Sequence, residues 1–269
     1  MTSAVFRNAT FSGYATGVLD LVAGGRRILS VPTQLGCKVG CTFCISSRQP
    51  LIRNLRAQEM LAMVDQCLAA EAADDRPLEL SFTGEGEPLL NWKQAELVVR
   101  HMAESGTAQG VRYCLSGLGA DKLLHRVDTA ILPTRLQVSL HAAQQTMRDR
   151  LVPNSIPLLL LSQVLHEQAP RFASIELNVV LQDGVNDSDA DLAALARWGD
   201  PTWPILLNPL LTEGTARVAL RAEYFAQELR AAGRDVRAYR HVAQKICAEK
   251  IYPQMSAQPI QFFKKVSGA

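Results

Sequence analysis

The chain has 269 residues, of which 48% are hydrophobic, and this is enough to bury one large core or two small ones. Its formal net charge of +2 is too small to indicate a nucleic-acid or anionic membrane partner by itself. No apolar run approaches the roughly 20 residues of a membrane span, and the first twenty residues do not resemble a signal peptide. Three of the six cysteines lie within eight residues, which is not the spacing of a secreted disulfide framework. We therefore expect a cytoplasmic protein without a membrane partner, whose clustered cysteines hold a metal or a metal cluster.

Strand-like runs rich in Val, Ile and Leu alternate along the chain with segments of helical period. The expected strands cover residues 26–34, 77–84, 111–117, 135–142, 174–181 and 203–210. The expected helices cover residues 55–73, 91–106, a short stretch near 120–130, 158–168, 187–199 and 222–233. These segments make six strand-helix units, followed by an extended segment within 234–240 and a helical stretch around Cys247.

Repeated strand-helix units predict an α/β fold with parallel strands, but the pattern leaves open an open sheet or an incomplete barrel. In both architectures the loops at the C-terminal ends of the strands build the site. The unusual residues follow those ends: Cys37, Cys41 and Cys44, the turn 84–91, Ser116, Ser139, His141 and Asn208. We divide the chain into a short N-terminal extension (1–25), the repeated α/β domain (26–233) and a C-terminal segment (234–269) that carries Cys247.

The cysteines of "LGCKVGCTFC" have the spacing C-x3-C-x2-C. A structural zinc site normally has four protein ligands, and the next candidates, Cys67 and His101, lack a paired spacing. An iron-sulfur cluster held by three thiolates leaves one iron open to a ligand that is not protein. Such an iron can bind the amino and carboxylate groups of S-adenosylmethionine (SAM), which then serves as a source of radicals. The spacing therefore favours a cluster over zinc.

This motif, with Phe43 before its last cysteine, resembles the radical SAM superfamily. Five further segments are similar to the adenine methyltransferases of the RlmN/Cfr type: "RNLRAQEM" (53–60), "GEGEPLLN" (84–91), "VSLHAAQQTMRDRLVPN" (138–154), "DGVNDS" (183–188) and "LLNPL" (206–210). Only Glu85 departs from the family's GMGEPLLN. The resemblance implies a TIM-like partial (βα)6 barrel over residues 26–233, a 4Fe-4S cluster on the three cysteines, SAM, and an electron donor such as flavodoxin or ferredoxin. The family's helical N-terminal RNA-binding domain has no counterpart in the roughly 25 residues before the first strand.

The resemblance also implies roles for individual residues. Gly86 and Glu87 match the family's Gly-Glu pair, which lies against the amino group of SAM, where a carboxylate attracts an ammonium. The other residues that match SAM-binding positions are Ser116, Ser139, His141 and Asn208. Each position also has a purely structural interpretation. Gly86 and Glu87 could simply form a glycine-rich turn, and Ser116 and Ser139 could cap strand ends. His141 could be a hydrogen-bonded histidine at a barrel rim, and Asn208 could start an Asn-Pro turn.

Cys247 is the candidate catalytic residue. In the family, a C-terminal cysteine accepts a methyl group from one SAM, and a radical from a second SAM abstracts hydrogen from that methyl. The carbon radical attacks an electron-poor adenine carbon, and a second cysteine resolves the resulting crosslink. That second cysteine stands seven residues before the first cluster ligand, where this chain has Ser30, and a hydroxyl is a poor replacement for a thiolate. We expect Cys67 and Cys114 to be buried structural cysteines, and whether Cys114 replaces the missing thiol stays open.

Positive charge is concentrated around the cysteine motif. Residues 21–58 contain no Asp or Glu, whereas six positions are basic: Arg26, Arg27, Lys38, Arg48, Arg53 and Arg56. Residues 234–250 add five basic against two acidic residues. A basic rim over a neutral body suits a phosphate-bearing substrate. We therefore predict a methyltransferase that acts on an adenine carbon of RNA or a nucleotide. The alternatives are radical SAM modification of a small molecule or peptide, and a non-enzymatic metal or cluster protein.

Overall fold

The computed structural model describes residues 7–11, 14–21, 26–48, 50–69, 75–212 and 215–238. One sheet runs through this part of the chain in the order β1-β2-β3-β6-β7-β8-β9-β10-β13. Its parallel strands are β3 (Arg26–Val31), β6 (Leu78–Phe82), β7 (Gly110–Leu115), β8 (Thr134–Ser139), β9 (Ser174–Val180), β10 (Ile205–Asn208) and β13 (Val236–Ala238). Each new parallel strand lies beside the preceding one, without the reversal of order that defines a doubly wound sheet. The predicted partial barrel is therefore confirmed, with β13 as an additional strand after the sixth unit.

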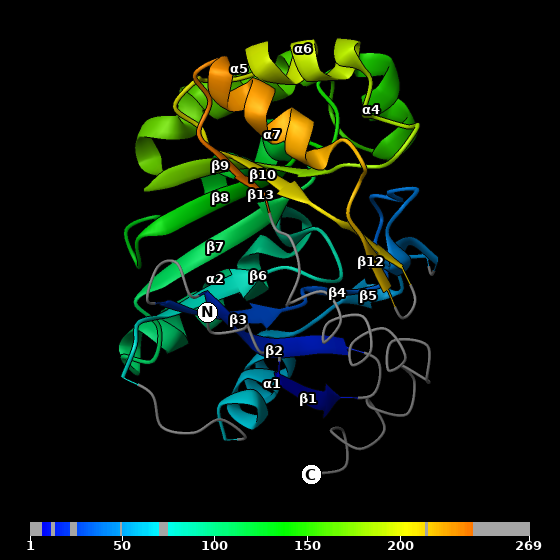
Figure 1. Ribbon diagram of the computed structural model, residues 1–269. Helices are drawn as coiled ribbons and strands as arrows, with labels where there is room; N and C mark the ends of the chain where they lie inside the picture. The colour runs from blue at the N-terminus through cyan, green and yellow to red at the C-terminus, as the bar shows by residue number, and fades with distance from the viewer. Residues whose placement is uncertain are drawn as a thin grey trace.

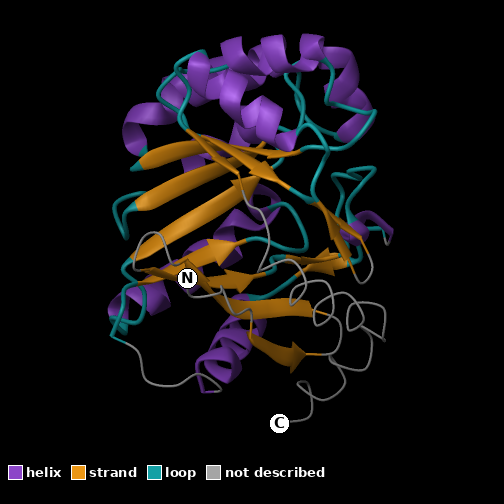
Figure 2. Cartoon of the chain, in the orientation of Figure 1, coloured by secondary structure: helices purple, strands orange, loops and turns teal. Residues whose placement is uncertain are grey.

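Five helices follow the strands as the alternation predicted: α1 (Ala57–Ala69), α2 (Trp92–Glu104), α5 (Leu158–Gln168), α6 (Asp189–Arg197) and α7 (Ala222–Ala231). A further helix, α4 (Gln145–Leu151), was not predicted. The expected helix near 120–130 is reduced to α3 (Ala120–Leu123) and a 3-10 turn, η3 (Leu124–Arg126). Figures 1 and 2 show the strands stacked in a curled sheet, with α5, α6 and α7 gathered beyond β9 and β10. Within the described part of the chain, no helix combines the length and apolar character needed to cross a membrane.

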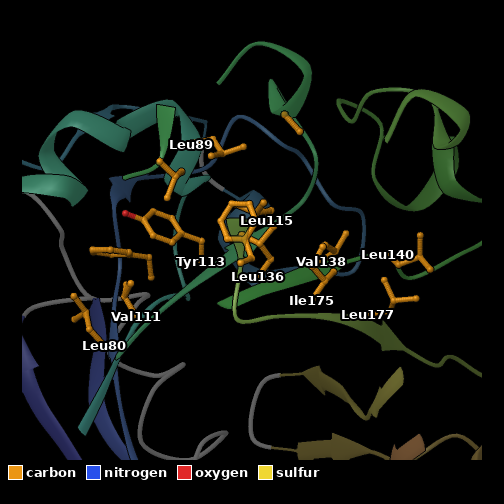
Figure 3. Close-up of a cluster of buried hydrophobic side chains, with 14 of the residues drawn as sticks. Leu80, Leu89, Val111, Tyr113, Leu115, Leu136, Val138, Leu140, Ile175 and Leu177 are labelled. Carbon is orange, nitrogen blue, oxygen red and sulfur yellow. The ribbon is translucent and has the colours of Figure 1, made fainter. Parts of the chain in front are cut away.

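The two faces of the sheet carry different side chains. In β8, Leu136 and Val138 are fully buried, whereas the alternate residues Arg135, Gln137 and Ser139 are only partly buried. This alternation follows from the period of two in a strand. Figure 3 shows apolar side chains of β6, β7, β8 and β9 packed together in the core, with Leu89 joining them from η2 (Pro88–Asn91). The core therefore lies on one face of the sheet and leaves the other face free for polar chemistry.

An ionic ladder crosses the polar face. The Arg112 guanidinium on β7 lies 2.8 Å from the Glu79 carboxylate on β6 and 3.2 Å from the Glu176 carboxylate on β9. Arg135 reaches Glu79 at 3.1 Å, and Arg237 reaches Glu176 at 3.6 Å. TIM barrels normally fill their interior with branched apolar side chains. This half-barrel instead joins five strands through charged side chains on its polar face.

A hairpin that we did not predict from the sequence extends the sheet. Strands β1 (Arg7–Phe11) and β2 (Tyr14–Leu21) pair antiparallel, and β2 pairs antiparallel with β3, with Gly17 opposite Ser30. The hairpin covers the edge of β3, which would otherwise be an open strand edge.

Candidate active site at the C-terminal ends of the strands

The loop that carries the three cysteines, residues 36–44, is closed at its base by a short strand pair and is hydrogen-bonded to residues 151–154, which follow β8 in the sequence. Strands β4 (Gln34–Leu35) and β5 (Arg53–Asn54) pair antiparallel and close its base. The N–H of Thr42 donates to the Leu151 carbonyl at 3.0 Å, and the Asn154 side-chain amide donates to the Lys38 carbonyl at 3.1 Å. The loop conformation therefore depends on the segment after β8, more than 100 residues later.

The sulfurs lie in an apolar environment. Val39, Ala142, Leu151 and Val152 form a small buried cluster, separate from the main core, and its partly buried neighbours include Cys37, Cys41 and Phe43. Burial raises the pKa of Cys37 to about 11 and the pKa of Cys41 to about 12. Within the described residues, no group of three or more His, Cys, Asp or Glu side chains surrounds a single metal ion. If the three thiols bind iron as the motif predicts, the metal has to displace their protons, because only the thiolate is a ligand.

Glu87 is a buried carboxylate with one unpaired oxygen. Its Oε2 accepts the Ser116 N–H at 2.7 Å and also the Ser116 hydroxyl, while Oε1 is buried without a hydrogen-bond partner among the described residues. Burial raises the pKa of Glu87 to about 7. A cation beside Oε1 would supply the missing partner and hold the carboxylate ionised. The predicted residues Glu87 and Ser116 are therefore brought together, in an arrangement that fits an ammonium group such as the amino group of SAM.

Gly86 makes room for the side chain that positions Glu87. Gln34 Oε1 accepts the Glu87 N–H at 2.7 Å. Gly86 has φ +99°, and a Cβ at this position would lie 2.6 Å from the Gln34 Cβ and 2.9 Å from its backbone N. Only glycine therefore allows both the positive φ of this turn and the close approach of Gln34. The sequence analysis did not identify Gln34 as a site residue.

We expect Gly86→Ala to lower the free energy of unfolding by about 2–4 kcal/mol, because it adds a steric overlap with backbone to a left-handed conformation. Gly184→Ala is the matched control, since Gly184 has φ +68° but no atom within 4 Å of an added Cβ. That control should lose only about 1–2 kcal/mol. Urea unfolding of the cluster-free chain measures both values, and equal losses would contradict the steric argument.

Arg148 is a site residue that the sequence reading missed. Its side chain is fully buried, and its guanidinium donates to the carbonyl oxygens of Ser116, Ser139 and Leu140 and to the Ser155 hydroxyl at 3.0 Å. Burial lowers the pKa of Arg148 to about 10, so that the group stays charged at neutral pH. Arg148 therefore joins the ends of β7 and β8, and it sets a positive charge near Cys41 and Glu87. The only sequence signal was its place within the "VSLHAAQQTMRDRLVPN" segment.

His141 forms part of the wall around the cysteine loop. It has φ +56°, the one positive value outside glycine in the described part of the chain. Its ring meets Phe43 edge-on, with centroids 4.7 Å apart, and its Nδ1 accepts the Val180 N–H at 3.1 Å. Burial, with a smaller effect from Arg148, lowers the pKa of His141 to about 3. At neutral pH the imidazole is therefore uncharged, with its proton on Nε2, and this nitrogen is the one available as a donor.

The remaining predicted SAM positions lie on neighbouring strands. Ser139 stands opposite Asn178 in the β8–β9 register, and the Asn208 side-chain amide donates to Asn178 Oδ1. Asn208 also borders a pocket of about 260 Å³ that Leu181 and Pro209 help to line. The polar side chains of Ser139, Asn178 and Asn208 thus stand on three neighbouring strands, and Asn178 is the one that the sequence did not predict.

Glu85, the departure from the family segment, has a defined contact. Its Oε1 accepts the N–H of Gly36 at 2.6 Å, next to the first cluster cysteine, and its backbone carbonyl accepts the N–H of Thr33 at 3.0 Å. Burial raises the pKa of Glu85 to about 7. Glu85 therefore ties the turn after β6 to the start of the cysteine loop.

The pKa of Glu85 predicts a pH-dependent stability. The native state holds the proton more tightly than the unfolded chain, whose carboxyl has the usual pKa of 4.5. The stability is therefore complete below pH 4.5 and decreases as the pH rises to about 7, by about 3 kcal/mol for this group. In urea unfolding of the cluster-free chain, Glu85→Gln should show a shallower decline over this window, while the exposed Glu104→Gln should follow the unmodified chain. Parallel curves for Glu85→Gln and the unmodified chain would refute this assignment.

The cysteines outside the motif differ in their burial and in their contacts. Cys67 is 1% exposed in α1, as predicted for a structural cysteine. Cys114 on β7 is only partly buried, and its thiol donates to Gln137 Oε1 at 3.3 Å. It lies 3.7 Å from the hydroxyl of Ser81, the residue that stands opposite Ser30 in the β3–β6 register. Cys247 lies outside the described residues.

The fold and the site define a class of protein, namely α/β half-barrels whose first strand leads into a loop with three cluster-binding thiols. Three features fit an iron-sulfur cluster with SAM: the apolar three-thiol loop, the unpaired Glu87 oxygen and the glycine turn beside it. No protein-family model matches the chain.

Individual proteins do match. A radical SAM methyltransferase from Sphaerobacter thermophilus superposes with a TM-score of 0.73 and 31% identity, over 85% of this chain and 70% of that one. A probable RNA methyltransferase from Anaeromyxobacter sp. (strain Fw109-5) is 34% identical over 69% of this chain and 56% of its own length. The dual-specificity RNA methyltransferase RlmN of Syntrophobacter fumaroxidans is 33% identical over 64% and 52%. The chain belongs to the radical SAM methyltransferase family, with RlmN-type relatives as the motifs predicted. It spans about half the length of the curated relatives that it matches.

Proposed function

We propose that the chain is a radical SAM enzyme that methylates an adenine carbon of RNA or of a nucleotide. The observation that carries this proposal is the placement of an unpaired, buried carboxylate, Glu87, beside a loop of three thiols. Cys37, Cys41 and Cys44 would hold a 4Fe-4S cluster, which when bound would supply the electron for reductive cleavage of SAM. The names of the relatives, RNA methyltransferases, support an RNA substrate.

The chain's own residues have distinct tasks in this function. Glu87 holds the amino group of SAM as a charge-assisted pair, and Ser116 fixes the orientation of the carboxylate through two hydrogen bonds. Phe43 and the apolar neighbours of the cysteine loop exclude water from the sulfurs. The neutral His141, together with Ser139 and Asn208, offers hydrogen-bond donors to the rest of SAM.

Cys247 is the proposed methyl carrier, which gives the C-terminal segment a catalytic role. The family's cycle ends when a second thiol releases the product, and Ser30 stands at that position. The proposal also includes a protein electron donor such as flavodoxin or ferredoxin, and a cytoplasmic location.

The test is anaerobic incubation of the reconstituted, reduced chain with methyl-labelled SAM and total RNA. We expect 5′-deoxyadenosine together with label in RNA, and we expect Cys247→Ala to lose the label in RNA while Cys67→Ala keeps it. Failure to form 5′-deoxyadenosine would overturn the enzymatic proposal and favour a non-enzymatic cluster protein.

Ser30 favours a second candidate, a radical SAM modification of a small molecule or peptide on the same scaffold. In that case SAM is cleaved and the label remains on Cys247 or leaves with a compound other than RNA. The same experiment therefore separates the two functions by the place where the label resides.

A further inference from the structure

A second pocket lies between residues 54–56, which precede α1, and residues 90–94, which end η2 and begin α2. Its volume is about 460 Å³, and the residues around it include Asn54, Arg56, Trp92, Lys93 and Gln94. The Gln94 Oε1 accepts the N–H of Ala57 at 2.8 Å, which fixes the two helix starts against each other. This hydrogen bond therefore ties the segment on one side of the pocket to the helix on the other side.

The pocket has a positive electrostatic character. Among the described residues that line it, none is acidic. The nearby Glu59 carboxylate is held by both guanidinium nitrogens of Arg53 at 2.8 Å. Arg56 is exposed, its backbone N–H donates to the Glu59 carboxylate at 2.8 Å, and its side-chain charge also acts on that carboxylate. The positive ends of the α1 and α2 dipoles add to the charges of Arg56 and Lys93.

An aromatic ring accompanies these charges. Trp92 is half-buried at the first position of α2, and the Lys93 ammonium lies 5.7 Å from its ring centroid. A partly exposed indole beside two cations is the combination that binds single-stranded nucleic acid, since the ring stacks on a base and the cations contact phosphates.

The pocket is also connected to the SAM-binding residues. Asn54, in its wall, accepts a hydrogen bond from Gln34 Nε2 at 2.8 Å, and Gln34 in turn accepts the N–H of Glu87 at 2.7 Å. The side chain of Gln34 therefore links the pocket wall to the backbone of Glu87. A nucleotide held here would lie on the side of Gln34 that faces away from Glu87.

We propose that this pocket binds the RNA substrate, with a base stacked on Trp92 and adjacent phosphates bound by Arg56 and Lys93. The inference rests on the proposed function and names the surface that this function requires. Because the contacts are to phosphate and to a ring face, the pocket binds RNA without reading its sequence.

The test measures binding of a fluorescently labelled single-stranded RNA oligomer to the full-length, anaerobically reconstituted chain as a function of KCl concentration. We expect R56Q/K93Q to bind about tenfold more weakly at low salt and to lower the salt slope by about 1.4, since each phosphate contact on a single strand contributes about 0.7. The control pair R76Q/R197Q removes two charges at the opposite end of the barrel and should keep both values.

A second pair of variants separates stacking from charge. Trp92→Ala should weaken binding roughly tenfold without changing the salt slope, and Trp92→Phe, which keeps a flat ring, should restore most of the affinity. If R56Q/K93Q keeps both the affinity and the salt slope of the unmodified chain, the inference about the pocket is overturned. This holds even if the unmodified chain methylates RNA. If RNA binding depends on these residues but the unmodified chain forms no methylated RNA, the pocket stands and the proposed function fails.

Discussion

Replacement of Cys41 by alanine is expected to leave the chain unable to retain iron after reconstitution. In the proposed site three thiolates hold a four-iron cluster, and the two that remain in the variant are too few protein ligands to retain it. The Cys41 sulfur is also packed by the small apolar cluster, so water does not replace it readily. The amount of 5′-deoxyadenosine formed from SAM should fall to the amount measured in buffer without protein.

The measurement is iron and sulfide per chain after anaerobic reconstitution, followed by quantification of 5′-deoxyadenosine. Cys67→Ala is the matched control, since Cys67 is buried in α1 and is expected to leave the iron content unchanged. A Cys41→Ala chain that retains its iron would show that the three-thiol assignment is wrong.

Arg148→Met should be the most destabilising substitution outside the cysteine motif. Methionine has a similar volume, but its thioether donates no hydrogen bond, so buried acceptors on Ser116, Ser139 and Leu140 lose a charged donor together. We expect a loss of about 3–5 kcal/mol in the free energy of unfolding and a melting temperature lower by about 10 °C. The cluster-free chain can be used for this measurement, because the substitution changes the free energy of unfolding and does not act through the cluster.

Arg150→Met provides the control on the same helix. Arg150 is exposed, and the same substitution there should change the free energy of unfolding by no more than about 0.5 kcal/mol. Similar losses at positions 148 and 150 would mean that the buried hydrogen bonds of Arg148 contribute little.

The alternation of strands and helices was readable from the sequence because both periods are local. In β6, all five residues are buried, and in β8 buried and partly buried residues alternate, which are the patterns of a covered strand and of a two-faced strand. The hairpin β1–β2 was missed because its segments, RNATF and YATGVLDL, mix small and polar residues with the apolar ones and lack the Val-, Ile- and Leu-rich runs that marked the other strands. Whether the strands form a barrel or an open sheet depends on strand order, which no local pattern contains.

Part of the candidate site could likewise be predicted from the sequence, and part of it is visible only in the tertiary structure. The C-x3-C-x2-C spacing determined by itself that three thiols lie on one loop, because eight residues cannot separate them far. By contrast, the burial of Arg148, the contact of Glu85 with Gly36 and the pocket between residues 54–56 and 90–94 arise only when distant segments meet. The sequence by itself therefore determined that the three thiols lie together. The tertiary structure decided their burial, their electrostatic surroundings and the surface beside them, since these depend on neighbours far along the chain.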